Sequence, residues 1–234
     1  FHYPISLGLF YSAITDYLGF EVNEGEFKVM GLASFGKPKY LSLLSQMIWY
    51  DSGQLKIDES FFDYPSNPTN YFSQKALDWL PGQTNSEEKT KGVHADLAAS
   101  AQSHLENLVI QIIADHSDSK DQAIFLSGGV AMNVALVSKI SQKFSSKKVF
   151  VPPSPGDSGS AFGAACMSIG LTQVQMDNPY FPGKRSVNFS QPRFVNTVKK
   201  TSEDIGLASE LIASGIPVAV LDDCMELGPR ARGA

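Results

Sequence analysis

The chain has few cysteines: only Cys166 and Cys224 occur among its 234 residues, and their separation matches no paired metal-ligand spacing. Disulfide frameworks and zinc clusters need more cysteines at regular intervals, so neither is expected. The sequence also lacks an uninterrupted apolar run of about 18 residues, which a membrane-spanning helix requires. These absences, together with 43% hydrophobic and 18% charged residues, predict a cytoplasmic globular protein with no membrane partner.

Basic residues are also not concentrated anywhere along the chain. The formal net charge is −5, and the 19 Lys and Arg residues are scattered. A general nucleic-acid binder presents a basic face, so we expect small-molecule partners and no nucleic acid.

The chain begins without an initiator Met or a signal-peptide layout, and it stops just after a motif-like stretch at 226–230. We therefore expect it to be a piece of a longer protein.

Apolar periodicity predicts the first helices. Apolar residues recur every three or four positions over 7–20 and over 96–116, the spacing of one buried helix stripe. A glycine-interleaved stretch over 21–40 is expected to form a loop leading into a helix near 29–33. Residues 51–92 are rich in Pro, Asn, Asp, Ser and Gly but carry aromatic residues, and they are expected to form an ordered insertion.

Two strand–turn–helix units follow. The first has an apolar run at 123–126, then Ser127-Gly128-Gly129, then a helical pattern over 130–144. The second has a strand at 148–151, a Pro-rich loop, and a small-residue helix over 158–169. Strands that alternate with helices predict an α/β layered domain. Beyond a linker at about 171–200, a helix over 201–213 and a strand over 216–221 are expected.

The Gly128-Gly129 turn is one candidate ligand site. Between a strand and a helix, backbone N–H groups can face phosphate or ribose oxygens, and glycine permits close approach. Asn133, about one turn into the expected helix, could reach the same ligand. Plain loop geometry remains an alternative for such a turn.

Asp157 is a second candidate, because a carboxylate at the mouth of a nucleotide cleft can hold a cation. The alternative role is a helix N-cap.

Glu26 could accept hydrogen bonds from ribose hydroxyls and Lys28 could contact phosphate, or the two could form a surface ion pair. Arg230 could bind a phosphate through its guanidinium group, or it could be solvated. His104 and His116 belong to the long helix and are expected to be structural or exposed.

Read in order, five motifs resemble the NodU/CmcH-type O-carbamoyltransferase family, and together they cover essentially the whole chain. They are Ser6–Tyr11 with Thr15 and Leu18-Gly19-Phe20; Gly25–Ala33, including Gly31, with Gly36; Leu126–Asn133; Pro152–Ala165 around Gly156-Asp157; and Glu226–Ala231.

The resemblance implies a fold and a domain plan. It implies the second half of an actin-like (ribonuclease H-like) ATP-binding lobe over 1–172, with an insertion at about 51–92. A linker over 173–200 and the start of a YrdC-like second α/β domain over 201–234 would follow. The first half of the lobe, with its metal-binding histidines, would lie upstream.

The resemblance also implies an activity. ATP and carbamoyl phosphate would give a carbamoyl-adenylate, whose carbamoyl group passes to a hydroxyl of a small sugar-like or antibiotic-like acceptor. Glu26, Lys28, Gly31, Gly128, Gly129 and Asn133 would hold the nucleotide. Asp157 would bind a divalent metal ion, with iron expected from the family, and Arg230 would act at the carbamoyl-phosphate site. The central expectation is that the corners near 128 and 157 open onto a common nucleotide cleft.

Three positions depart from the family pattern: Ile5, Val137 and Arg232. Two alternatives stay open beside carbamoyl transfer. One is a tRNA-modifying enzyme of the threonylcarbamoyl-adenosine type. The other is a nucleotide-binding module without transferase activity.

Overall fold

The computed structural model describes residues 2–67, 70–82, 92–171, 202–216 and 218. The chain divides into two compact units, Phe1–Asp157 and Ser158–Ala234. Each unit is described by itself below.

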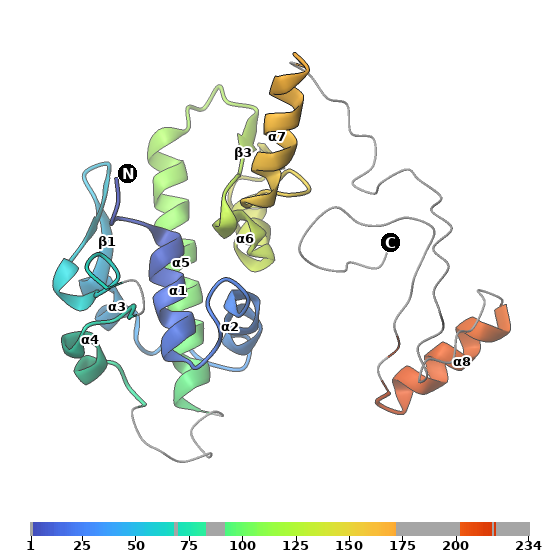
Figure 1. Cartoon of the computed structure of the whole chain (residues 1–234), viewed down its shortest axis with the longest axis horizontal. Helices are drawn as coiled ribbons and strands as arrows, with labels where there is room; N and C mark the ends of the chain where they lie inside the picture. Colours follow the sequence, from blue (N-terminus) through green and yellow to red (C-terminus); the bar gives the residue numbers. More distant parts are fainter. Residues whose placement is uncertain (1, 68–69, 83–91, 172–201, 217, 219–234) are drawn as a thin grey trace. The chain divides into compact units, whose positions relative to one another are not determined.

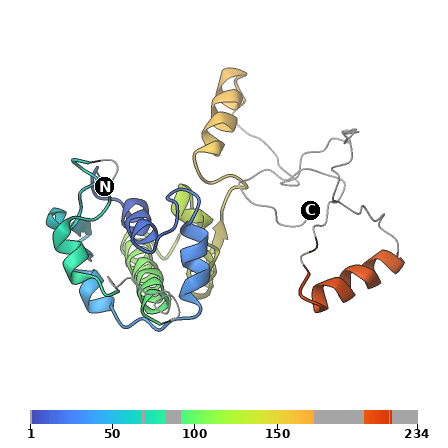
Figure 2. The ribbon, with the colours of Figure 1, turned by 60° about the horizontal axis from the view of Figure 1, so that its bottom comes forward.

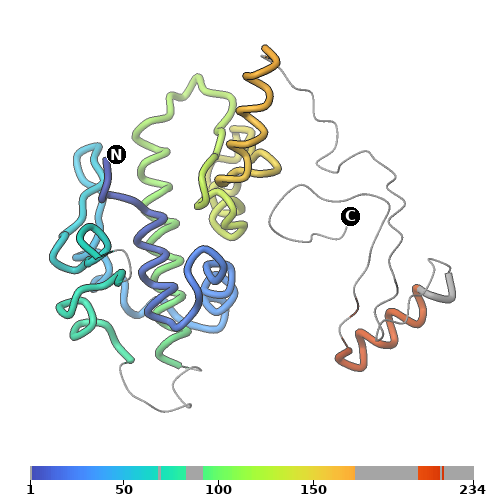
Figure 3. The backbone as a smooth tube through the Cα atoms, viewed as in Figure 1, coloured from blue at the N-terminus to red at the C-terminus, as the bar shows by residue number. Residues whose placement is uncertain are grey.

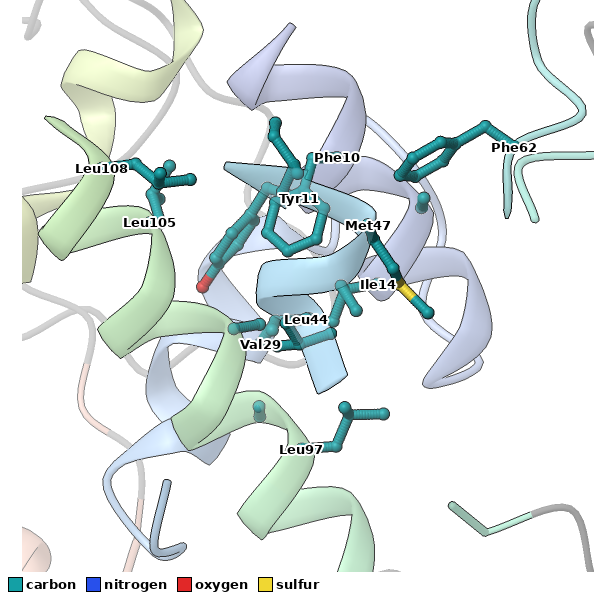
Figure 4. Close-up of a cluster of buried hydrophobic side chains, with 14 of the residues drawn as sticks. Phe10, Tyr11, Ile14, Val29, Leu44, Met47, Phe62, Leu97, Leu105 and Leu108 are labelled. Carbon is teal, nitrogen blue, oxygen red and sulfur yellow. The ribbon is translucent and has the colours of Figure 1, made fainter. Parts of the chain in front are cut away.

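Two helices form the centre of the first unit. Helix α1 (Leu7–Tyr17) is capped by Ser6, whose side chain accepts a hydrogen bond from the backbone N–H of Leu9 at 3.2 Å. Helix α5 (Val93–His116) packs beside it (Figures 1 and 2). Both predicted helices are confirmed. The side chains shown in Figure 4 include the fully buried Phe10, Ile14, Val29, Leu44, Met47 and Leu97.

Helix α2 (Glu26–Ala33) packs along α5 and begins three residues earlier than the sequence predicts. Two glycines allow the chain around it to approach other backbone segments. A Cβ atom on Gly36 would lie 1.9 Å from the carbonyl oxygen of Ala95, and one on Gly25 would lie 2.6 Å from the Cβ of Phe20. The glycines of the second motif therefore contribute to close packing.

Residues 41–67 and 70–82 form regular elements, whereas 68–69 and 83–91 of the insertion predicted over 51–92 lie outside the described residues. Helix α3 (Leu41–Met47) leads into an antiparallel hairpin of β1 (Ile48–Asp51) and β2 (Gln54–Ile57), followed by the 3₁₀ turn η1 (Glu59–Phe61) and helix α4 (Gln74–Trp79). These elements lie on one side of the α1–α5 pair (Figure 1). The aromatic residues Phe61, Phe62, Tyr64 and Phe72 are buried.

On the other side of the helix pair lies a parallel strand pair. The chain turns back after α5 into β3 (Ala123–Phe125), which pairs with β4 (Lys148–Phe150) (Figure 3). Between them lie the 3₁₀ turn η3 (Gly129–Met132) and helix α6 (Val134–Lys143). The helix predicted from 130 is therefore wrong at its start: a 3₁₀ turn precedes it, and Asn133 caps α6.

The second unit contains α7 (Ser158–Ser168) and α8 (Ser202–Ala213), both near their predicted positions. The linker from 172 onward and most of the strand expected over 216–221 lie outside the described residues. Within the described ranges, the helices and two small sheets agree with an α/β class. In the part of the chain that the structure describes, no helix is long and apolar enough to cross a bilayer.

Candidate functional site at the ends of the parallel strands

The two predicted corners lie side by side at the carboxyl ends of β3 and β4. The backbone N–H of Gly128 donates a hydrogen bond to the carbonyl oxygen of Pro155 at 2.7 Å, and the Ser127 hydroxyl donates to the same oxygen at 3.3 Å. Leu126 continues the strand pairing by donating its N–H to the carbonyl oxygen of Phe150 at 2.9 Å. The corners thus share one edge, but the Gly128 amide is engaged by the neighbouring loop. The expectation that this N–H faces a ligand is wrong for this structure.

Glycine is needed at the first corner because of backbone conformation. Gly128 has φ 90° and ψ 166°, a region that side-chain-bearing residues rarely adopt. The neighbouring chain is also close: a Cβ atom on Gly156 would lie 3.3 Å from the Met132 Cε, and one on Gly8 would lie 3.7 Å from the Val130 Cγ2. The start of α1 and the second corner therefore both border η3.

Asn133 lies at the N-cap of α6, not one turn inside a helix. Its Oδ1 accepts the backbone N–H of Leu136 at 3.0 Å. The same amide pairs with Gln102 of α5: Asn133 Nδ2 donates to Gln102 Oε1 at 2.9 Å, and Gln102 Nε2 donates to Asn133 Oδ1 at 3.1 Å. Asn133 is therefore held by both α5 and α6.

Gln102 belongs to a buried polar network. The Tyr11 hydroxyl donates to Gln102 Oε1 at 2.9 Å, and Gln102 Nε2 donates to Glu106 Oε1 at 2.8 Å. Lys139 of α6 forms an ion pair with Glu106 at 2.7 Å. Burial, followed by the negative charges of Glu106 and Glu26, raises the pKa of Tyr11 well above its usual value. Tyr11 therefore stays protonated and serves as a donor.

Glu26 is half-buried at the start of α2, where it accepts hydrogen bonds from the Ser12 hydroxyl at 2.9 Å and from the backbone N–H of Asn23 at 3.0 Å. Because Ser12 follows Tyr11 in α1, Glu26 and Asn133 both border the same stretch of that helix. Lys28 is exposed, with its ammonium group 5.9 Å from the centre of the Phe27 ring.

Among the described residues, Gly31 and Asp157 form no hydrogen bond or ion pair with this arrangement. Gly31 lies on the exposed side of α2, and a Cβ atom there would meet no atom within 4 Å. Asp157 is exposed at the end of the first unit. Arg230 lies outside the described residues. Their predicted roles stay predictions.

A metal site cannot be assembled from the described residues. Within the ranges that the structure describes, no group of three or more His, Cys, Asp or Glu side chains is placed to hold a metal ion. A divalent cation needs several such ligands. Asp157 alone does not meet that requirement.

Of the two expected roles for His104, structural or exposed, the structure shows the structural one. Its side chain is buried, with its ring 5.9 Å from the Phe10 ring in an edge-on contact. Its Nε2 lies 2.8 Å from the carbonyl oxygen of Ile48. Burial lowers the pKa of His104 and so favours the neutral ring. The hydrogen bond to Ile48 raises the pKa and offsets part of that effect. His104 is a core residue that joins α5 to the hairpin. His116 is exposed, as expected.

The sequence reasoning missed Gln102, Tyr11 and Glu106. One signal was present: Gln102 and Glu106 are four residues apart in the long helix, so they share a face beside its apolar stripe. Polar residues beside a buried stripe need partners. The partners themselves come from distant parts of the chain.

Comparison with known proteins gives consistent results. The family profile described as "Carbamoyltransferase N-terminus" matches residues 1–166. An uncharacterized protein of Synechocystis, sll1178, is 31% identical over 99% of this chain and 41% of its own length. Nodulation protein NolO of Bradyrhizobium diazoefficiens is 27% identical over 97% of this chain and 42% of its own length. Nodulation protein U of Sinorhizobium fredii is 31% identical over 59% of this chain and 25% of its own length.

The chain spans about two-fifths of the length of the first two of these relatives, at 41% and 42%. The predicted resemblance is confirmed by the profile match and by the nodulation proteins. This chain belongs to the carbamoyltransferase N-terminal family.

Proposed function

We propose that the full-length protein is an ATP-dependent O-carbamoyltransferase, and that this chain supplies one wall of its nucleotide site. Given the family, the observation that most supports this proposal is that the loop after β3 and the loop after β4 lie next to each other. Gly128 and Pro155 are hydrogen-bonded at 2.7 Å at the carboxyl ends of two parallel strands. In open α/β sheets, ligands bind at this edge of parallel strands.

The proposal places named side chains around the nucleotide. Gly129 and the loop over 152–157 would border it, while the Asn133 amide and the Glu26 carboxylate would contact its hydroxyl groups. Lys28 would meet phosphate as a point charge. The engaged amide of Gly128 has a structural role in this scheme, because it holds the two loops together.

The remaining predicted residues complete the proposal. Gly31 would allow the nucleotide to approach α2. Asp157 would supply one metal ligand and the other ligands would come from elsewhere in the protein. Arg230 would bind carbamoyl phosphate through its guanidinium fork. The actin-like lobe is likewise part of the proposal, supported by the parallel strand–turn–helix unit of β3, α6 and β4.

The chemistry follows from the substrates. Water would attack the phosphorus of carbamoyl phosphate and give carbamate and inorganic phosphate, and a carbamate oxygen would then displace pyrophosphate from the α-phosphorus of ATP. An acceptor hydroxyl would then attack the carbamoyl carbon, lose its proton and release AMP. Positioning of the carbamoyl carbon and stabilisation of phosphate charge are what the protein must supply.

The test is an assay of the full-length protein with ATP, carbamoyl phosphate and a panel of sugars and aminoglycosides. The proposal predicts pyrophosphate release that depends on carbamoyl phosphate, AMP release that depends on an acceptor, and a carbamoylated product visible by mass spectrometry. ATP binding without pyrophosphate release would favour a nucleotide-binding module. Carbamoyl transfer to tRNA but to no small acceptor would favour a tRNA-modifying enzyme.

A further inference from the structure

Gln102 lies at the middle of α5 with all its hydrogen-bonding capacity used. The residue is 6% exposed. Its Oε1 accepts hydrogen bonds from Tyr11 and Asn133, and its Nε2 donates to Asn133 and Glu106, at distances of 2.8 to 3.1 Å. A primary amide offers two donors and two acceptor sites. A rotation of the Gln102 amide by half a turn would therefore set donors against donors, so only one orientation is compatible with its neighbours.

This fixed amide determines the position of Asn133. Both polar atoms of the Asn133 side chain bond Gln102, and its Oδ1 also caps α6 through Leu136. The Asn133 amide cannot turn without breaking its bonds to Gln102, and a buried amide left without a partner is costly. One of the two Nδ2 hydrogens is used by Gln102, and Asn133 is only half-buried.

Groups from three helices hold Gln102 in turn. Tyr11 comes from α1, Glu106 lies one turn further along α5, and Lys139 of α6 is paired with Glu106 at 2.7 Å. Asn133 caps the start of α6 and Lys139 lies in the middle of it, so this helix is tied to α5 at two points. The corner after β3 is thereby connected to the centre of the helix core.

We propose that Gln102 is a positioning residue for nucleotide binding: it holds the Asn133 amide in the orientation in which its half-exposed side can meet the nucleotide. The inference rests on the proposed function for the identity of the ligand. The simpler possibility is that Gln102 only stabilises the fold. The two make different predictions about Asn133 and about ATP affinity.

The first experiment needs no ligand. The substitution Gln102→Met keeps the length of the side chain and removes the amide. A crystal structure of the full-length variant is expected to show Asn133 in a changed side-chain rotamer, while its backbone carbonyl oxygen still accepts the N–H of Val137 at the start of α6. An unchanged Asn133 side chain would overturn the proposal, whatever the protein binds.

The second experiment measures ATP affinity of the full-length protein by calorimetry in a double-mutant cycle. Asn133→Ser keeps a side chain that caps helices well but removes the amide. Gln102→Met is expected to weaken ATP binding about tenfold, as the loss of one well-placed hydrogen bond would. In the Asn133→Ser background the same change should have no further effect. Equal effects in both backgrounds would show that Gln102 does not act through Asn133.

The matched control is Ser100→Ala, which removes a buried polar group from the same helix. Ser100 donates to the carbonyl oxygen of Asp96 at 2.6 Å and accepts the backbone N–H of Tyr40 at 2.9 Å. This variant should lower the melting temperature without changing ATP affinity. Parallel losses of ATP affinity in Ser100→Ala and Gln102→Met would indicate a general structural effect and contradict positioning. Failure of the unaltered protein to bind ATP would refute the proposed function, and the crystal structure alone would then decide on Gln102.

Discussion

The backbone N–H of Gly128 donates a hydrogen bond of 2.7 Å to the carbonyl oxygen of Pro155, and this bond ties the loop after β3 to the loop after β4. Neither loop alone identifies a ligand edge, because glycine turns and proline-rich loops are common. Joined at the carboxyl ends of two parallel strands, they form the kind of edge at which α/β proteins bind ligands. Gly128 has a positive φ at this corner, so we expect any other residue there to strain the backbone.

The substitution Gly128→Ala tests that reason. Gly128 has φ 90° and no atom within 4 Å of an added Cβ, so the cost would come from backbone strain alone. We expect a loss of about 1–3 kcal/mol in the free energy of unfolding. Gly129→Ala is the control, because a Cβ there meets only the Met132 Cε, at 4.0 Å. Urea titrations followed by tryptophan fluorescence measure both; equal losses would contradict the strain argument.

A second glycine pair separates close packing from helix propensity. Gly36→Ala would place a Cβ atom 1.9 Å from the Ala95 carbonyl oxygen, so α5 would have to shift. We expect a loss of about 1–3 kcal/mol in stability. Gly31→Ala lies inside α2 with nothing within 4 Å and should stabilise the protein by about 0.5–1 kcal/mol. Trp49 and Trp79 both report on this unit by fluorescence. Stabilisation by both changes would refute the close contact at Gly36.

Long apolar stripes made α1 and α5 predictable, since each buries a complete helix face. The hairpin of β1 and β2 was missed, although the dipeptide Ser52-Gly53 at its turn is a turn signal in the sequence. In the structure these two residues have φ 52° and 79°, and positive φ angles at both positions are what a two-residue hairpin turn requires. The start of α6 was misplaced because Asn133 was assigned to the helix interior, whereas Asn favours the N-cap.

The polar network could not have been predicted from local pattern. Gln102 meets Tyr11 across 91 positions and Asn133 across 31 positions in the sequence. Periodicity reports which face of a helix is buried and carries no information about which distant side chain it meets. The same limit applies to His104, whose partner Ile48 lies in an element that the sequence did not predict.

Stability should depend on pH through His104. Burial lowers the pKa of His104 in the folded state, so the unfolded chain binds the proton first as the pH falls below about 6.5. Proton uptake then favours unfolding, and the urea midpoint should fall between about pH 8 and pH 5.5. His104→Gln, which keeps an N–H donor for Ile48, should reduce that fall. An unchanged pH dependence in the variant would show that His104 is not its source.

The pair of Glu106 and Lys139 should matter more than a surface pair. Lys139→Met would leave the Glu106 carboxylate, whose side chain is 9% exposed, without its cation, and we expect a loss of about 1–3 kcal/mol in stability. The control is Lys56→Met, which removes the partner of Asp51 in a pair whose side chains are 38% and 54% exposed. That change should cost at most about 0.5 kcal/mol. Comparable losses, measured by urea titration, would place Glu106 in contact with water.

The account depends most on a nucleotide lying at the edge formed by Gly128 and Pro155. Photolabelling of the full-length protein with an azido analogue of ATP, followed by peptide mapping, locates the nucleotide directly. We predict labelled peptides from 127–133 or 152–157, and loss of label when excess ATP competes. Labelling confined to other peptides, or label that ATP does not displace, would contradict the account.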